Sequence, residues 1–368
     1  MKLLFYIDSL NGLNGVQRSI VARCNMLAAR GHEVYILSNV NYDPSGFMVE
    51  PVDARVSIID YQSLTRHSTP LSNKLLKRCY VRIIRLFALD RFLAHLKPDI
   101  IVTQSDDSLR GFFLVRHHGA KYVAEWATTI DYNEVPYKYN RRLWLCWMSW
   151  HVDKYVFLVK HDLEIFPGPK SKAIVIPTFV KTSETQSPLS NKVVISTGRL
   201  SPIKNYKMLV DAWVSVAASH PDWQLHIYGD GNLRPELEQQ IATLGLTGKV
   251  VLKGMTNNVS SALLNASIFA FTTRGEGFSN SILEAVAHGL PIVITETSCA
   301  HDLMDGYEIG YMVAQGDKSA LASCINHLIE DEACRRRLGN LAYLRSLDFA
   351  REKIVLEHES LYRKLLGD

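Results

Sequence analysis

Two carboxylates and two glycines lie together in residues 274–284, and their types and spacing suit ligand chemistry. Glu276 stands between Gly275 and Gly277, and Glu284 follows after seven intervening residues. Loop glycines let a backbone approach a ligand closely, and carboxylates accept hydrogen bonds from hydroxyl groups. Acidic side chains repel phosphate, so the hydroxyls of a sugar or a ribose are the expected targets. In the alternative interpretation, Glu284 is a solvated helix residue and Glu276 belongs to a turn.

Two cations occupy a second loop. Arg199 and Lys204 follow the apolar segment 193–197. A planar guanidinium can hold two phosphate oxygens at once, and an ammonium adds a compact charge. Two such cations at the end of one predicted strand indicate a diphosphate site, although as isolated residues they would be ordinary surface charges.

Residues 269–295 are predicted to form a strand, a loop, a helix and a second strand. This order of elements positions the two glutamates. The apolar segment 269–273 predicts a buried strand, and residues 279–286 show the apolar spacing of a helix. Ser279 is expected to cap this helix with its hydroxyl, and Gly289 with Pro291 ends it. The free N–H groups at the start of the helix favour an anion such as a diphosphate.

Residues 276–293 resemble the signature of the retaining GT-B glycosyltransferases, a large family that includes bacterial polysaccharide and lipopolysaccharide enzymes. The signature has two glutamates separated by seven residues, followed in register by Gly-x-Pro, here Gly289 to Pro291. Residues 198–200 and 204–205 are also similar to the family's diphosphate-binding element. The resemblance implies an α/β GT-B fold, in which two Rossmann-like domains face each other across a cleft.

The resemblance also implies which residues act. Glu276, Arg199 and Lys204 are expected to be catalytic, the glutamate on the donor sugar and the two cations on the leaving diphosphate. Glu284 is expected to hold the ribose. The residues expected to bind the donor are Gly12, Gly15, Gly198, Arg199, Lys204, Gly229, Gly254, Glu276, Gly277, Phe278, Ser279 and Glu284. Without the resemblance, the Gly12 and Gly15 pair predicts only a turn.

A tryptophan stands where the family often has a histidine that approaches the transferred sugar. This residue, Trp126, begins the predicted loop after the strand 121–125. A mechanism centred on that histidine is therefore not expected here. The acceptor-side candidates are Glu125, Trp126, Thr128 and Asp131.

Length and composition are consistent with two domains. A chain of 368 residues exceeds what one core usually supports, and its hydrophobic content of 47% can fill two. Strands and helices alternate in the first half, and a Pro/Gly-rich segment at 166–171 precedes the polar segment 181–191. We therefore expect an acceptor-binding domain at 1–180 and a nucleotide-sugar-binding domain at 181–351. By resemblance, a last helix at about 352–368 packs back on the first domain.

The expected location is the cytoplasm, with a peripheral position on the inner face of the cytoplasmic membrane. Six cysteines are scattered without C-x-x-C pairing, which is typical of reduced thiols, and no apolar stretch approaches a membrane span. The segment Lys74 to Arg91 interleaves basic and apolar residues, so it can lie on an anionic bilayer surface. Alternatively, the segment is a surface helix packed on the sheet. The two interpretations are compatible with each other. A net charge of +4 does not indicate a nucleic-acid partner.

The activity implied is transfer of a sugar, with retention at the anomeric carbon, from a nucleotide diphosphate sugar to a glycan or lipid-linked saccharide in cell-surface polysaccharide assembly. No Asp-x-Asp pair occurs in the chain, so no metal and no cofactor beyond the donor are expected. Two other classes stay open: a sugar-nucleotide epimerase of the same architecture, and a catalytically silent nucleotide-sugar-binding protein. A glycosidase is disfavoured, because its two carboxylates must flank one bond at roughly 5–10 Å.

Overall fold

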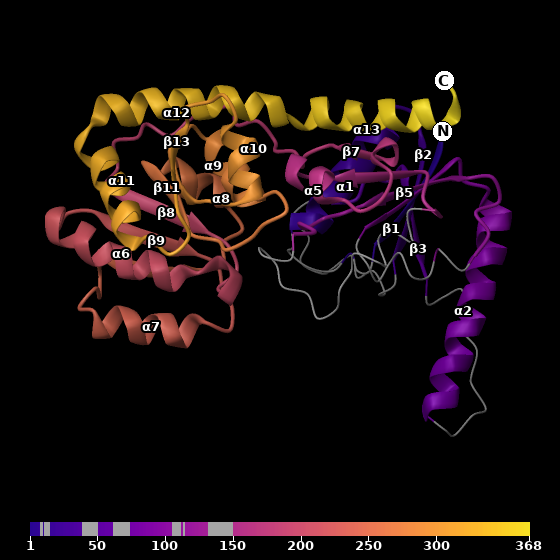
Figure 1. Ribbon diagram of the computed structural model, residues 1–368, viewed down its shortest axis with the longest axis horizontal. Coiled ribbons are helices and arrows are strands. Elements are labelled where there is room, and N and C mark those ends of the chain that lie inside the picture. The colour runs from indigo at the N-terminus through magenta and orange to yellow at the C-terminus, as the bar shows by residue number, and fades with distance from the viewer. Residues whose placement is uncertain are drawn as a thin grey trace.

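The structure is a computed structural model of the chain. It describes residues 1–7, 10, 15–38, 51–61, 74–104, 112, 115–131 and 150–368, and over residues 74–83 it describes the helical backbone only. Two parallel sheets, each with its own helices, make up the described part, and a long pair of helices spans both (Figure 1).

The first sheet has seven strands in the order β3-β2-β1-β4-β5-β6-β7, and every neighbouring pair is parallel. The strands are β1 Lys2–Ile7, β2 Glu33–Ser38, β3 Val56–Asp60, β4 Ile100–Gln104, β5 Lys121–Glu125, β6 Lys154–Phe157 and β7 Ala173–Val175. Leu3 and Phe5 enter one apolar core, while Leu4 and Tyr6 enter another on the opposite face. Burial of both faces explains why these strands are almost continuously apolar.

The second sheet has six parallel strands in the order β10-β9-β8-β11-β12-β13. They are β8 Val193–Thr197, β9 Gln224–Tyr228, β10 Val250–Gly254, β11 Ile268–Phe271, β12 Ile292–Thr295 and β13 Gly310–Val313. Val194 and Ile195 again enter two different cores on the two faces. The prediction of two Rossmann-like α/β units is confirmed.

Helices cover both sheets. Those of the first unit are α1 Gly15–Ala29, α2 Lys74–Leu96 and α5 Lys160–Ile165. Those of the second are α6 Tyr206–Ser219, α7 Arg234–Thr243, α8 Val259–Leu264, α9 Asn280–Ala287, α10 Ser298–Met304, α11 Lys318–Glu330 and α12 Glu332–Ser346. Among the helices that the structure describes, none combines the length and apolar character that crossing a membrane requires.

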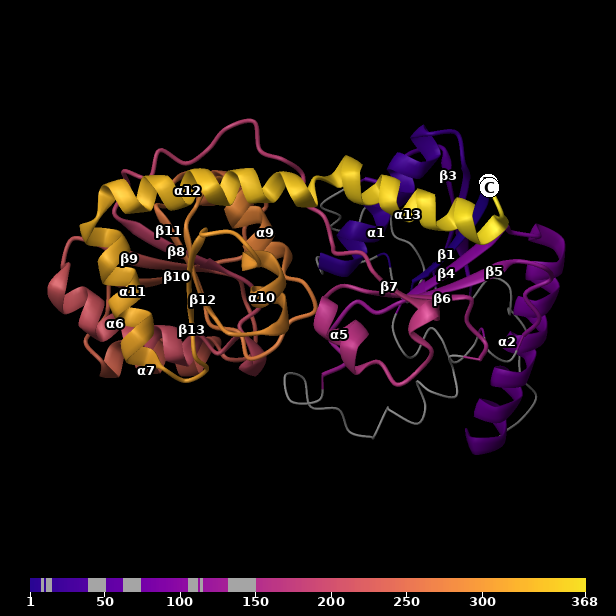
Figure 2. The same cartoon turned by 45° about the horizontal axis from the view of Figure 1, so that its top comes forward.

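The last helix, α13 Arg351–Leu366, leaves the second unit and packs on the first (Figures 1 and 2). Its residues Ile354, Val355, Leu361 and Tyr362 belong to the same core as β1 and α1. The two chain crossings between the units lie side by side, because Val180 N donates to the Phe349 carbonyl and Arg351 N donates to the Val180 carbonyl. The two crossings are therefore held together at one place between the units.

The predicted basic helix is longer than the sequence pattern indicated, since α2 continues to Leu96. Leu89 and Leu93 are buried in the core beneath the sheet, so the second half of the helix packs as an ordinary surface helix. Phe87 is exposed. The side chains of Lys74, Lys77, Arg78 and Arg82 lie outside the described residues.

Candidate active site

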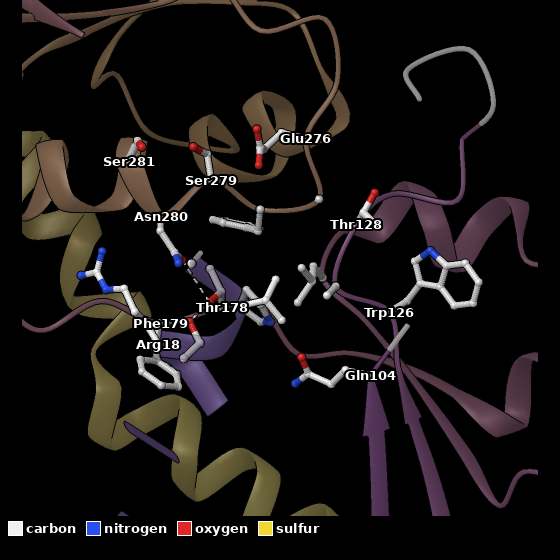
Figure 3. A pocket seen from close by; sticks show the side chains of 18 of the residues that line it. Arg18, Gln104, Trp126, Thr128, Thr178, Phe179, Glu276, Ser279, Asn280 and Ser281 are labelled. Atoms are coloured by element: carbon white, nitrogen blue, oxygen red, sulfur yellow. Dashed lines mark hydrogen bonds between the residues drawn. The ribbon is translucent and has the colours of Figure 1, made fainter. Parts of the chain in front are cut away.

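A cavity of about 490 Å³ lies between the two domains, where the carboxyl ends of both sheets meet. The first domain contributes the start of α1, the ends of β4, β5 and β6, and residues 176–179. The second contributes residues 198–204 after β8 and residues 275–284 after β11. Parallel α/β sheets bind ligands at this edge, and Figure 3 shows part of the lining.

The end of β11 fixes the loop that carries Lys204. Thr272 Oγ1 donates to the carbonyls of Lys204 and Asn205, each at 3.1 Å. Thr273 Oγ1 donates to the Ile203 carbonyl at 3.2 Å. Two loops that are about seventy residues apart in sequence are thereby held at one edge of the sheet. Lys204 on the first loop can therefore reach Glu276 on the second.

Lys204 and Glu276 are in direct contact through Nζ and Oε2, and both side chains are largely buried. The Lys204 ammonium also lies 4.8 Å from the centre of the Phe271 ring, an additional cation–π contact. Arg199 is exposed and lines the same cavity. The structure thus brings the three residues predicted to be catalytic to one wall.

The Glu276 loop also touches the first domain. A Cβ added to Gly277 would stand 2.7 Å from the Thr128 Cα and 2.9 Å from the Ala127 carbonyl oxygen, so only glycine allows this approach. Phe278 is buried against Phe349, with ring centres 5.2 Å apart. The close approach of Gly277 shows that the two domains are in contact across the cleft.

Ser279 stands at the N-cap position of α9, but its side chain makes no capping hydrogen bond. The predicted capping hydroxyl is therefore wrong, although the predicted start of the helix is right. Ser279 is buried and lines the cavity. Its hydroxyl is thus placed on the ligand side of the helix start instead of closing the first turn.

Glu284 forms an ion pair with Arg18 of the first domain, with Arg18 NH2 and Glu284 Oε1 2.8 Å apart. Beside it, a Cβ added to Gly15 would stand 2.4 Å from the Asn280 side-chain nitrogen. Both predicted residues, Gly15 and Glu284, therefore lie where the domains touch. The other predicted glycine of this loop, Gly12, lies outside the described residues.

Three further predicted donor residues lie at the carboxyl edge of the second sheet. Gly198 lines the cavity, and its N–H donates to the Tyr228 carbonyl at 2.9 Å. Gly229 N donates to the Gly254 carbonyl at 2.8 Å. Gly229 and Gly254 do not belong to the cavity lining, so they hold the neighbouring loops together beside it.

Glu125 lies in a buried polar cluster beneath the cavity. Arg23 binds it through two hydrogen bonds of 2.7 and 2.5 Å, and Gln104 Nε2 donates to it at 2.8 Å. Arg23 also contacts the His358 ring of α13. Burial, and then the Arg23 charge, hold the pKa of His358 well below its usual range, so this ring is neutral. All four residues line the cavity floor.

The other three acceptor-side candidates lie in different places. Trp126 is 2% exposed and its side chain joins the aromatic core of the first domain; Figure 3 shows the ring turned away from Glu276. Thr128 lines the cavity. Asp131 pairs with His161 at 2.9 Å and is absent from the cavity lining. Glu125, Trp126 and Thr128 thus line the cavity, although the Trp126 ring packs into the aromatic core, and Asp131 lies outside the lining.

Several polar residues of the cavity lining were not predicted from the sequence, and four of them lie where the two domains meet or beside the predicted residues. They are Arg18, Gln104, Thr178 and Asn280, all labelled in Figure 3. Thr178 Oγ1 donates to Asn280 Oδ1 across the domain boundary at 3.3 Å. Two of the four had a signal in the sequence, because Arg18 follows Gly15 closely and Asn280 lies between the two glutamates.

Two family models match consecutive parts of the chain. Residues 13–184 match the model described as Glycosyltransferase Family 4, and residues 191–331 match Glycosyl transferases group 1. The chain carries the two domains of a glycosyltransferase. Its architecture is the GT-B fold, because it resembles solved structures of GT-B glycosyltransferases over nearly its whole length. TarM of S. aureus, crystallised as a mutant with fondaparinux, α-GlcNAc-glycerol and UDP, has a TM-score of 0.81 at 14% identity and covers 98% of this chain and 100% of that one.

Further similarities agree with this glycosyltransferase assignment. Anabaena Alr3699/HepE in complex with UDP and glucose has a TM-score of 0.77 at 19% identity, covering 98% of this chain and 99% of that one. The amylovoran biosynthesis glycosyltransferase AmsD of Erwinia amylovora is 23% identical over 96% of this chain and 97% of that protein.

Two relatives match over part of their length. An N-acetylgalactosaminyltransferase of Campylobacter jejuni that acts on a diphospho-undecaprenol-linked sugar, by its name, is 32% identical over 45% of both chains. An exopolysaccharide phosphotransferase of Streptomyces coelicolor is 33% identical over 50% of this chain and 20% of that protein. The chain therefore spans less than half the length of either.

Proposed function

We propose that this glycosyltransferase moves a sugar from a nucleotide diphosphate sugar to a glycan or lipid-linked saccharide in cell-surface polysaccharide assembly. The reaction retains the anomeric configuration and uses no metal. The observation that carries the proposal is the contact of Lys204 with Glu276 in the interdomain cavity, with Arg199 on the same wall. A cation for phosphate beside a carboxylate for hydroxyls suits the junction of a sugar with its diphosphate.

Each charged group has a distinct task in this proposal. Arg199 and Lys204 stabilise negative charge that develops on the leaving diphosphate, which is the principal demand of an oxocarbenium-like transition state. Glu276 accepts hydrogen bonds from hydroxyls of the donor sugar. Glu284, about one turn into α9, accepts them from the ribose. The names of the Erwinia and Campylobacter relatives support a polysaccharide or lipid-linked acceptor.

The proposal also covers where in the cell the enzyme acts. A membrane-anchored acceptor requires the enzyme to reach the inner face of the cytoplasmic membrane. The basic residues of the segment Lys74 to Arg91 belong to α2, at the end of the first domain that faces away from the second domain (Figure 1). A helix in that position can meet a bilayer surface while the cavity stays accessible.

Incubation with a panel of labelled nucleotide diphosphate sugars and a bacterial lipid extract tests this function. We expect a glycosylated lipid whose new anomeric centre has the donor's configuration by NMR. Conversion of the free nucleotide sugar without an acceptor would identify an epimerase instead. Absence of any product, with nucleotide binding retained, would identify a silent binding protein, and an inverted product would refute retention.

A further inference from the structure

The Arg18–Glu284 ion pair joins the two domains inside the binding cavity. Arg18 lies in the first turn of α1, whereas Glu284 lies in α9 of the second domain. Their side chains are 33% and 18% exposed, and the contact of 2.8 Å uses Glu284 Oε1. Among the residues that the structure describes, Arg18 is the only hydrogen-bonding partner of the Glu284 carboxylate. This pair can exist only while the cleft is closed.

The pair also stands in a wall shared by two cavities. Arg18, Ser19, Phe179, Asn280 and Glu284 line both the cavity described above and a second one of about 580 Å³. The second cavity continues along α9 to His288 and residues 256–260. Glu284 is thus the carboxylate between the proposed diphosphate site and a further pocket, where a nucleoside attached to that diphosphate would extend.

The remaining contacts of this wall hold the pair in register. Ser19 Oγ lies 3.3 Å from Thr178 Oγ1, which donates to Asn280 Oδ1 at 3.3 Å. Ser19 follows Arg18 directly in α1, and Asn280 lies one helical turn before Glu284 in α9. The neighbours of the ion pair are therefore linked across the cleft through Thr178.

A carboxylate offers about four acceptor positions on its two oxygens. Arg18 occupies Oε1 and holds the carboxylate in one orientation, which leaves Oε2 for hydroxyls of a ligand. We propose that Arg18 is a positioning residue for Glu284, so that the hydroxyl site on Glu284 is complete only when the first domain closes on the second. The inference rests on the proposed function, because it takes the ligand of Glu284 to be the ribose of a nucleotide.

A second ion pair across the cleft supplies a matched control. Lys160 Nζ lies 2.6 Å from Asp305 Oδ2, and the two side chains are 61% and 62% exposed. Lys160 lies at the start of α5 in the first domain, and it lines neither of the two cavities that share Glu284. Lys160→Ala therefore removes a contact between the domains without touching the glutamate.

The experiment measures binding of nucleoside diphosphates by calorimetry, using ADP, GDP, UDP and CDP and then the 2′,3′-dideoxy form of the tightest one. We expect wild type to prefer the ribose form by about tenfold or more, the size of one hydrogen bond to a charged group. Arg18→Ala should lose most of this preference, Arg18→Lys should keep part of it, and Lys160→Ala should keep all of it. The double variant Arg18→Ala, Glu284→Gln should prefer the ribose form over the dideoxy form as strongly as Glu284→Gln alone does.

Each outcome decides a different statement. If Arg18→Ala keeps the preference of wild type, the inference is wrong while the proposed function stands. If Lys160→Ala loses the preference equally, Arg18 acts through closure in general and not by positioning Glu284. If wild type binds none of the nucleotides, the proposed function fails and the inference fails with it. Thermal unfolding of Arg18→Ala within a few degrees of wild type shows that a loss is not caused by misfolding.

Discussion

At the scale of single residues, the site is preorganised by opposite charges. Lys204 is held by the Glu276 carboxylate and by the face of the Phe271 ring, and all three lie in the second domain. A side chain held in this way loses little rotamer entropy when a ligand binds. The ammonium therefore meets the diphosphate from a fixed position instead of searching for it.

Removal of either cation should slow transfer. We expect Lys204→Ala and Arg199→Ala each to lower turnover at saturating donor by about tenfold or more, because a charged hydrogen bond to the leaving group is lost. Lys207→Ala is the matched control, since its ammonium pairs with Glu236 on the exposed surface. Unchanged turnover in either of the first two variants would contradict the assignment.

The two glutamates should fail in different ways. Glu276→Gln is expected to lower turnover much more than Glu284→Gln at saturating donor, because Glu276 holds the reacting sugar. Glu284→Gln should mainly raise the donor's Michaelis constant, since the ribose does not react. Steady-state kinetics of both variants decide the matter, and the reverse ranking would show that the two roles are exchanged.

Sequence spacing, together with the family resemblance, was sufficient to predict that Arg199, Lys204, Glu276 and Glu284 lie together, because each lies in a loop or helix directly after a recognisable strand. It was not sufficient for Arg18. Its role depends on a partner 266 residues away, and no local pattern encodes how far a cleft closes. The direction of a loop side chain was equally hidden, because packing in the aromatic core decides where the Trp126 indole points.

At the scale of elements, two glycines set the distance between the domains, but they do so differently. Gly277 faces the Thr128 Cα and the Ala127 carbonyl, which are backbone atoms. Gly15 faces the amide of the Asn280 side chain, which can rotate away. Backbone atoms cannot rotate away, so the contact at Gly277 limits the approach of the domains more strictly than the contact at Gly15 does.

Gly277→Ala should therefore hold the cleft partly open. We expect a larger radius of gyration by small-angle scattering and a loss of transfer of about tenfold or more, as for misplaced reacting groups. Gly15→Ala should change both quantities less. Equal effects of the two substitutions would show that the Gly277 contact does not limit closure.

Helix α13 brings a neutral histidine into the first domain. His358 lies against Arg23 in a fully buried cluster, and its pKa is held well below the usual 6.5 by burial and then by the Arg23 charge. The unfolded chain takes up a proton as the pH falls below about 6.5, but the folded chain does not. This residue therefore contributes stability above pH 6.5 that is lost as the pH falls.

Chemical denaturation at pH 7 and pH 5 tests this assignment. We expect wild type to lose more of its free energy of unfolding over this interval than His358→Gln does, by at most about 2 kcal/mol. Glutamine keeps an acceptor for Arg23 but does not titrate. Other histidines with a lowered pKa, such as His226, are present in both proteins and cancel. The same pH dependence in both proteins would contradict a buried neutral His358.

The strands were legible in the sequence, because strands such as β4 and β12 are buried on both faces and are mostly apolar. Short helices such as α8 and α10 were not predicted. The end of α2 was less legible. Its basic residues stop before the helix does, and Leu89 and Leu93 continue the apolar side down to Leu96. Charge pattern alone cannot show where a helix leaves the surface and joins a core.

At the scale of the whole molecule, the proposed contact of α2 with a membrane can be tested directly. We expect the protein to co-sediment with anionic vesicles at low salt and to be released as salt rises, with about 1 kcal/mol from each basic residue near the surface. A quadruple substitution to glutamine should weaken both vesicle binding and transfer to a lipid-linked acceptor, without changing donor affinity. Its positions are Lys74, Lys77, Arg78 and Arg82.

A control variant that loses the same number of positive charges elsewhere shows whether the position of the charges matters or only the net charge of the protein. It replaces four exposed lysines of the second domain with glutamine: Lys192, Lys207, Lys253 and Lys318. This variant should still bind vesicles as wild type does. If wild type and the α2 variant bind equally at every salt concentration, the segment is a packing helix only.

The path of α13 has a consequence for how the protein is made. Domains generally fold in order as the chain emerges during synthesis, the N-terminal one first. Here the core around β1 and α1 includes Ile354, Val355, Leu361 and Tyr362, which are translated after the whole second domain. The domain that is synthesised first is therefore the domain completed last. Until then Arg23 and Glu125 lack the His358 ring, and the apolar core of the nascent first domain lacks the four side chains of α13.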